Sequence, residues 1–150
     1  MAERVIGVIP ARFGATRFPG KPLAPIAGKP MIQHIVERAR QAPSLTEVVV
    51  ATDDARIVRA VEGFGGTAVM TSATHRSGTD RIAEVARQRE AAVFLNIQGD
   101  EPLVHAEQLD ALAKFLLAHR AVPMATLMTP ITRPDDIQSP HVVKVVADQG

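Results

Sequence analysis

The chain has 150 residues, a formal net charge of +1 at pH 7 and 46% hydrophobic residues, which suffices for a single domain with a buried core. It contains no cysteine, which excludes disulfides, thiol catalysis and thiolate metal sites. Near-neutral charge and five aromatic residues, all phenylalanine, speak against a nucleic-acid partner. No apolar run could span a bilayer and the first residues lack signal-peptide features, so we expect a cytoplasmic protein without a membrane partner.

Runs rich in valine and isoleucine alternate along the chain with amphipathic segments whose apolar residues recur every three or four positions. The runs predict buried strands and the amphipathic segments predict helices. In chain order, we expect a strand at 5–9, a helix at 31–41, a strand at 48–52, a helix at 55–64, a strand at 67–70, a helix at 78–90, a strand at 93–97, a helix at 107–118, and strands at 124–128 and 142–146.

This alternation predicts an α/β fold in which helices cover both faces of a mostly parallel sheet. Ligands of such sheets bind outside the carboxyl ends of the strands. The loop after the first strand, Asp53, and the segment Gln98-Gly-Asp-Glu-Pro102 all follow predicted strands. We therefore expect one crevice to collect all three.

The loop after the first strand is free of acidic residues and rich in cations. No acid occurs between Glu3 and Glu37, whereas this stretch contains five lysines and arginines, at positions 4, 12, 17, 21 and 29. Such a loop favours a strongly anionic ligand, and Arg12 and Lys21 are the expected phosphate contacts. It is not a P-loop, because five residues separate Gly14 from Gly20 and Pro22 replaces the hydroxyl residue.

The segment Gln98-Gly-Asp-Glu-Pro102 places two carboxylates after an apolar strand. Asp100 is the expected magnesium ligand, and Gly99 would permit close approach of the backbone. In the alternative interpretation, both carboxylates only favour the start of the next helix through its dipole. The five histidines contain no helical metal-binding pair, so zinc is not indicated.

Three other motifs favour structural roles. Ser77-Gly-Thr-Asp80 has the form of a capping box before a helix, although its neighbours His75 and Arg76 would also suit the edge of a ligand site. Asp53-Asp54 indicates a helix N-cap first and a ligand contact second. The glycines at 63–66 formally fit a dinucleotide fingerprint but end a predicted helix, which indicates a C-cap.

A series of short motifs is similar, in the same order, to signatures of the 3-deoxy-manno-octulosonate (Kdo) cytidylyltransferase family, the CMP-Kdo synthetases of lipopolysaccharide synthesis. The motifs cover nearly the whole chain. They are Ile9-Pro-Ala-Arg12 with Thr16-Arg17, Pro19-Gly-Lys-Pro-Leu23, Gly28-Lys-Pro-Met-Ile32, Ala51-Thr-Asp-Asp54, His75 with Ser77-Gly-Thr-Asp-Arg81, Asn96-Ile-Gln-Gly-Asp-Glu-Pro102 and Val143-Lys-Val-Val146.

The resemblance implies a Rossmann-like nucleotidyltransferase domain over residues 1–150 that binds CTP with magnesium. It implies that the anomeric hydroxyl of Kdo attacks the α-phosphate and that pyrophosphate leaves. Catalysis would then involve Arg12, Lys21 and Asp100, with Asp100 as the metal ligand. The implied nucleotide-binding residues are Pro10, Ala11, Arg12, Arg17, Lys21, Ser77 and Gln98.

Chains of this family continue well past residue 150, so the resemblance also implies that a C-terminal portion is absent here. That portion would bring a second magnesium-binding aspartate, most of the Kdo pocket and the contacts of a homodimer. Two alternatives remain open at this point. One is a different CMP-sugar synthetase, acting on sialic acid or an amino analogue of Kdo, and the other is a CTP-binding module without catalytic activity.

Overall fold

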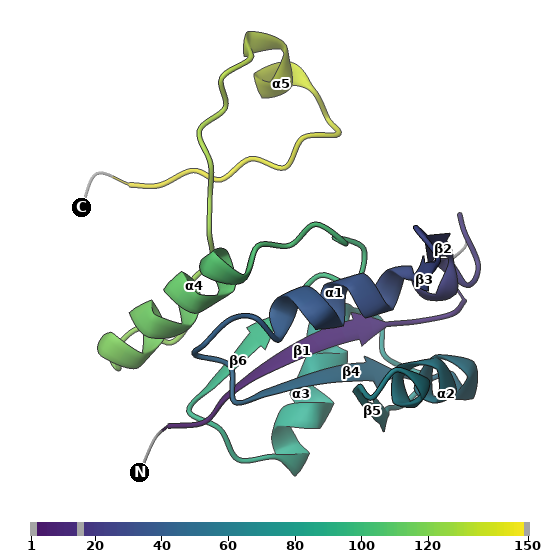
Figure 1. Ribbon diagram of the computed structural model, residues 1–150. Helices are drawn as coiled ribbons and strands as arrows, with labels where there is room; N and C mark the ends of the chain where they lie inside the picture. Colours follow the sequence, from purple (N-terminus) through teal and green to yellow (C-terminus); the bar gives the residue numbers. More distant parts are fainter. Residues whose placement is uncertain (1–2, 15–16, 149–150) are drawn as a thin grey trace.

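A four-stranded parallel sheet forms the centre of the protein, of which the computed structural model describes residues 3–14 and 17–148. The strands β1 (Val5–Ala11), β4 (Glu47–Thr52), β5 (Thr67–Met70) and β6 (Val93–Asn96) lie in the order β5-β4-β1-β6. In register, Val8 of β1 lies beside Val49 of β4 and Asn96 of β6. The helices are α1 (Met31–Ala39), α2 (Ala55–Gly63), α3 (Gly78–Gln88) and α4 (Ala106–Ala118) (Figure 1).

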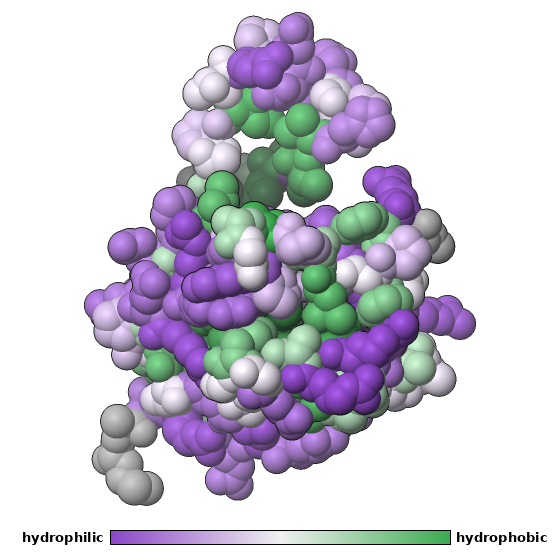
Figure 2. Space-filling view, turned by 45° about the vertical axis from the view of Figure 1, so that its right-hand side comes forward, coloured by the Kyte–Doolittle hydropathy of each residue, from purple (hydrophilic) through white to green (hydrophobic). Residues whose placement is uncertain are grey.

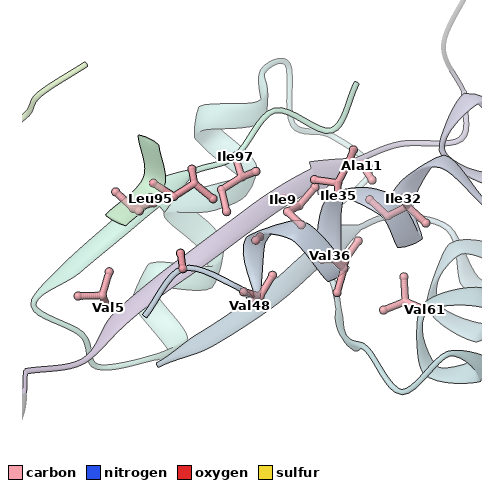
Figure 3. Packing of buried hydrophobic residues seen from close by; sticks show 14 of the residues in the cluster. Val5, Ile9, Ala11, Ile32, Ile35, Val36, Val48, Val61, Leu95 and Ile97 are labelled. Carbon is pink, nitrogen blue, oxygen red and sulfur yellow. The ribbon is translucent and has the colours of Figure 1, made fainter. Parts of the chain in front are cut away.

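Side chains of alternate strand residues divide the core between the two faces of the sheet. Val5 and Ile9 of β1 belong to a buried cluster that also contains residues of α1, α2 and α4 (Figure 3). Ile6 and Val8 belong to a second cluster with residues of α3. Helices therefore cover both faces, and the predicted α/β fold is confirmed.

The first four predicted strands and all four predicted helices occur, with ends displaced by at most two residues. The strands predicted at 124–128 and 142–146 are wrong. Neither segment joins a strand ladder, and Met124 and Val146 are 82% and 94% exposed. A valine-rich run becomes a strand only where a neighbouring strand receives its backbone N–H and C=O groups, and the local pattern does not specify that neighbour.

The chain beyond α4 extends away from the sheet and carries the short helix α5 (Pro134–Gln138) (Figure 1). Hydrophobic residues gather on this projecting segment, where they form a green patch in Figure 2. No helix within the described ranges is long and apolar enough to cross a membrane.

Small elements between β1 and α1 escaped prediction. They are the 3₁₀ turn η1 (Lys21–Leu23) and a hairpin of β2 (Pro25–Ile26) and β3 (Lys29–Pro30). Ala27 and Gly28 at the hairpin turn both have positive φ angles, 47° and 81°. Two-residue hairpin turns with positive φ favour Asn-Gly or Asp-Gly, so Ala-Gly is a weak signal.

Candidate nucleotide-binding site

A pocket of about 610 Å³ opens at the carboxyl ends of β1 and β6. From β1 the chain proceeds to β4 and β5 on one side and then crosses to β6 on the other, so the strand order reverses between β1 and β6. Such a reversal leaves a crevice in which α/β proteins bind ligands. The lining residues are Pro10, Ala11, Arg12, Arg17, Phe18, Lys21, Pro22, Met31, His75, Arg76, Ser77, Gly78, Arg81, Gln98, Gly99 and Asp100.

All eight residues that the family resemblance implies for nucleotide binding or catalysis line this one pocket. They come from three segments that are far apart in the sequence. The residues are Pro10, Ala11, Arg12, Arg17, Lys21, Ser77, Gln98 and Asp100. Glu101 and Pro102 are not among the lining residues, and Ala15 and Thr16 lie outside the described part of the chain. The expected convergence of the first loop with the segment after β6 therefore occurs, while the roles of the individual residues stay predictions.

Two glycines allow the three segments to meet at Pro10. A Cβ atom on Gly99 would lie 2.3 Å from the carbonyl oxygen of Pro10. A Cβ atom on Gly78 would lie 3.1 Å from Cγ of the Pro10 ring. The first distance is far below any tolerated contact. The close backbone approach predicted for Gly99 is thus observed, and the approach is to the end of β1.

The pocket is strongly cationic. Five of its lining residues are lysine or arginine, and one is a carboxylate, Asp100. Arg12, Arg17 and Arg76 are exposed and make no ion pair with any described residue. Unpaired cations around a concave surface raise the local concentration of anions, so the pocket suits a multiply charged anionic ligand.

Lys21 and Asp100 face each other across the pocket, with Lys21 Nζ 3.5 Å from Asp100 Oδ2. Lys21 begins η1, directly after Gly20, whose φ of 73° favours glycine. The amide of Gly20 donates to the carbonyl of Phe13 at 2.8 Å, which closes the base of the cationic loop. The guanidinium of Arg56 lies 3.3 Å from the centroid of the Phe13 ring and holds it against α2.

The start of α3 forms another wall of the pocket. Ser77 is the N-cap of α3, and its Oγ accepts a hydrogen bond from the Asp80 amide at 3.1 Å. The same hydroxyl donates to Asp80 Oδ2 at 2.8 Å. The predicted N-cap is confirmed, although Asp80 accepts from the Ser77 hydroxyl where a full capping box would have it accept from the Ser77 amide. Ser77 lines the pocket as well.

The paired aspartates after β4 have separate functions. Asp54 caps α2, accepting from the Arg56 amide at 2.8 Å, as predicted. The hydrogen bond from the Arg56 side chain lowers the pKa of Asp54 to about 2. The expectation that Asp53 lines the crevice is wrong, because its carboxylate instead binds Arg81, which does line the pocket, at 3.0 Å.

His75 is held by a carboxylate on α3. Its Nε2 lies 2.5 Å from Glu84 Oε2, and the same oxygen accepts a hydrogen bond from the Ser72 amide at 3.0 Å. The Ser72 amide and then His75 lower the pKa of Glu84. The ionised carboxylate thus fixes the segment between β5 and α3, to which His75 and Ser77 both belong.

The lining residues supply only part of the ligand set that a magnesium ion needs. Among the residues that the structure describes, no three histidine, aspartate or glutamate side chains form a metal-binding group. Asp100 is the single carboxylate in the lining. Mg²⁺ usually binds through one or two carboxylates together with substrate phosphates. One aspartate therefore fits a metal ion whose other ligands include the phosphates of a nucleotide.

Sequence reasoning missed Arg81 as a pocket residue. Its side chain is buried, with only 3% of the residue exposed, although arginine is seldom buried without a partner. Its position one residue before Ile82 and four before Val85, on the apolar face of α3, was a signal that it points inward. Phe18, Pro22 and Met31 also line the pocket, and no chemical feature of the sequence distinguished them.

Comparisons with known proteins agree with this arrangement. A family profile described as cytidylyltransferase matches residues 6–150. The 3-deoxy-manno-octulosonate cytidylyltransferase of Syntrophobacter fumaroxidans is 54% identical over 98% of this chain and 60% of its own length. The enzyme of the same name from Idiomarina loihiensis is 56% identical over 94% of this chain and 56% of its own length. This chain thus spans about 60% of the curated relatives that it matches.

Solved structures share the fold. The structure of CMP:2-keto-3-deoxy-manno-octonic acid synthetase complexed with CTP superposes with a TM-score of 0.78 and 49% identity, over 80% of this chain and 50% of that one. A cytidylyltransferase from Leptospira borgpetersenii superposes with a TM-score of 0.69 at 24% identity, over 79% of this chain and 50% of that one.

The architecture and the cationic pocket at the switch point define an α/β protein of the Rossmann-like nucleotidyltransferase fold class. Within that class the chain belongs to the cytidylyltransferase family. The resemblance to 3-deoxy-manno-octulosonate cytidylyltransferases found in the sequence is confirmed by the two relatives that carry this name.

Proposed function

We propose that this chain is the nucleotide-binding part of a CMP-Kdo synthetase, which converts CTP and Kdo into CMP-Kdo and pyrophosphate. The convergence of Lys21, Ser77 and Asp100 around one cationic pocket carries the proposal. The names of the relatives and the synthetase solved with CTP support the choice of nucleotide and sugar. The complete enzyme would be a cytoplasmic homodimer that supplies lipopolysaccharide synthesis.

In the proposed reaction, the anomeric hydroxyl oxygen of Kdo forms a bond to the α-phosphorus of CTP. The bond from that phosphorus to the oxygen bridging to the β-phosphate breaks, pyrophosphate leaves with the electron pair, and the hydroxyl proton passes to solvent or to the pyrophosphate. Arg12 and Lys21 would hold the triphosphate and offset the charge that develops on the leaving group. Pro10, Ala11, Arg17, Ser77 and Gln98 would orient the nucleotide.

Asp100 would hold magnesium together with the phosphates. When bound, the metal ion supplies positive charge to the phosphate oxygens and makes the phosphorus easier to attack. Lys21 Nζ and Asp100 Oδ2 pair with each other at 3.5 Å. When a magnesium nucleotide binds, a phosphate would replace Asp100 as the partner of Lys21, and the metal ion would replace Lys21 as the partner of Asp100. Neither charged side chain would be left without a partner.

Calorimetric titration of the chain with CTP, and with ATP for comparison, tests the nucleotide assignment. We expect CTP to bind in preference to ATP, and magnesium to strengthen the binding. Lys21→Ala is expected to weaken CTP binding by at least about tenfold, because a charge-assisted contact contributes on the order of 1.5–3 kcal/mol. Lys29→Ala is the matched control, since Lys29 pairs with Glu37 and does not line the pocket.

Asp100→Asn tests the metal assignment, because a neutral amide is a poor ligand for a hard dication. We expect the variant to lose most of the gain in CTP affinity that magnesium confers. Glu101→Gln removes the adjacent carboxylate, which does not line the pocket, and should retain that gain. Equal magnesium dependence in the wild type and Asp100→Asn would remove Asp100 from the metal site.

A further inference from the structure

The segment 71–77 forms a wall of the pocket without regular secondary structure of its own. It joins β5 to α3, and its last three residues, His75, Arg76 and Ser77, line the pocket. An irregular wall must be ordered before it can bind a ligand, and ordering it at the moment of binding costs affinity. Contacts within the chain that hold this segment in place therefore favour ligand binding.

Arg81 anchors the beginning of the segment. Its guanidinium donates to the hydroxyl of Thr71 and, at 3.3 Å, to the carbonyl of Ser72. The other terminal nitrogen donates to Asp53 Oδ2 at 3.0 Å, so Arg81 also links the segment to the end of β4. The arginine is 3% exposed and Thr71 is 7% exposed, so water competes little for these hydrogen bonds.

Glu84 anchors the middle of the segment, one turn further along α3. One carboxylate oxygen accepts from both the Ser72 amide at 3.0 Å and His75 Nε2 at 2.5 Å. An ionised carboxylate can only accept, so Nε2 of His75 carries a hydrogen. The contact therefore fixes both the position of the imidazole ring and the nitrogen that bears its hydrogen.

We propose that Arg81 and Glu84 are positioning residues, which hold the segment 71–77 in its binding conformation and present His75 and Ser77 to the nucleotide. The inference rests on the proposed function for the identity of the ligand. The holding contacts themselves are made between residues of the chain. Two side chains of α3 thus fix the shape of one wall of the nucleotide pocket.

Glu84→Gln is the central test, because it preserves size and tests the carboxylate alone. In the chain labelled with ¹⁵N-histidine, long-range ¹H–¹⁵N NMR reports which ring nitrogen of His75 bears hydrogen, and the spectrum of His75→Asn assigns the signals. We expect hydrogen on Nε2 in the wild type and a mixture of tautomers in Glu84→Gln. ¹⁵N relaxation should show greater motion of the amides at 72–77, and CTP should bind about fivefold more weakly.

Two further variants complete the design. Glu90→Gln removes a carboxylate just beyond α3 and should match the wild type in all three measurements. Arg81→Lys keeps a positive charge beside Asp53 but loses the forked contacts to Thr71 and Ser72, so it should loosen the amides at 72–77 while circular dichroism shows a folded chain.

Unchanged His75 tautomer, amide relaxation and CTP affinity in Glu84→Gln would overturn the inference. Relaxation at 72–77 that does not change in Arg81→Lys would overturn the role of Arg81. If the wild type binds no nucleotide while Glu84→Gln loosens the segment, the proposed function fails and the holding role of Glu84 stands. The NMR measurements on the ligand-free chain separate these outcomes.

Discussion

A single carbonyl oxygen, that of Pro10, sets how closely the walls of the pocket approach. A Cβ on Gly99 would lie 2.3 Å from this oxygen, which belongs to backbone and cannot rotate away. The segment carrying Gln98 and Asp100 therefore depends on glycine for its distance from β1. The shape of the pocket thus depends on Gly99 having no side chain, as well as on the charged side chains that line it.

Gly99→Ala is expected to push the segment after β6 away from β1. Relieving such an overlap costs about 1–3 kcal/mol of unfolding free energy, and Asp100 moves with its neighbour. CTP affinity should fall at least as much as in Asp100→Asn. Urea unfolding and calorimetry measure the two effects, and Gly14→Ala is the control, because a Cβ there meets nothing within 4 Å.

The sequence revealed those site residues whose chemistry is visible in their neighbours along the chain. Lys21 stands in a long stretch without acids, and Asp100 follows an apolar strand, so both were predicted. Arg81 was missed because its partners Asp53 and Thr71 directly follow two separate strands, β4 and β5, far from it in the sequence. A buried charge cluster that joins distant segments has no local signature, and it becomes visible only when the fold brings those segments together.

Helix α2 shows how local chemistry can define an element completely. Asp54 caps its start, and its end has the paired hydrogen bonds of a Schellman motif, from Gly66 N to Val61 O at 2.8 Å and from Gly65 N to Glu62 O at 2.9 Å. Gly65 has a φ of 76°. The glycine cluster is therefore a helix C-cap, as predicted.

Gly65→Ala is expected to destabilise the chain by about 1–2 kcal/mol, since a side chain disfavours the left-handed conformation by that amount. Gly63→Ala is a matched substitution two residues earlier, inside α2, where a Cβ meets nothing within 4 Å. That control should be neutral or stabilising because alanine favours helix. Urea unfolding of both variants makes the comparison, and equal destabilisation would contradict the C-cap argument.

Asp54→Asn is expected to change how stability depends on pH. The pKa of Asp54 is lowered from 3.8 to about 2 in the folded chain, chiefly by the hydrogen bond from the Arg56 side chain. Its stabilisation is therefore present above pH 3.8 and is lost as the pH falls towards 2. The variant should lose less stability than the wild type between about pH 5 and pH 2 in thermal unfolding.

Glu62→Gln is the control for this prediction, because Glu62 is an exposed residue of the same helix that does not cap it. Its loss of stability on acidification should match that of the wild type. A wild-type loss in Asp54→Asn as well would show that the cap contributes nothing to the acid sensitivity.

Elements with strong internal signals were predicted well, and elements that need a partner were not. Helices α1 to α3 have apolar faces of the helical period, and β1 and β4 are central strands whose apolar residues serve both faces of the sheet. The run at 142–146 is rich in valine, as β4 is. It nevertheless forms no strand here, because strand formation depends on a neighbour that composition does not name.

For the molecule as a whole, stability should be distributed unevenly. Strands β1 and β4 have strand neighbours on both edges and bury most of their side chains. The residues at 139–148 are largely exposed and belong to no ladder or helix. Hydrogen-exchange mass spectrometry is expected to show slow exchange in β1 and β4 and near-random-coil exchange at 139–148. Protection there equal to that of β4 would show that the segment is paired in solution.

The imbalance of charge around the pocket acts beyond contact distance. Among the described residues that line the pocket, five are cationic, and the one carboxylate, Asp100, already pairs with Lys21. An approaching triphosphate therefore experiences attraction before it touches any residue. Such attraction accelerates diffusional encounter, and dissolved ions weaken it over about 8 Å at physiological ionic strength. The rate of nucleotide capture should consequently decline as salt is added, whereas the capture of an uncharged nucleoside would be insensitive to salt.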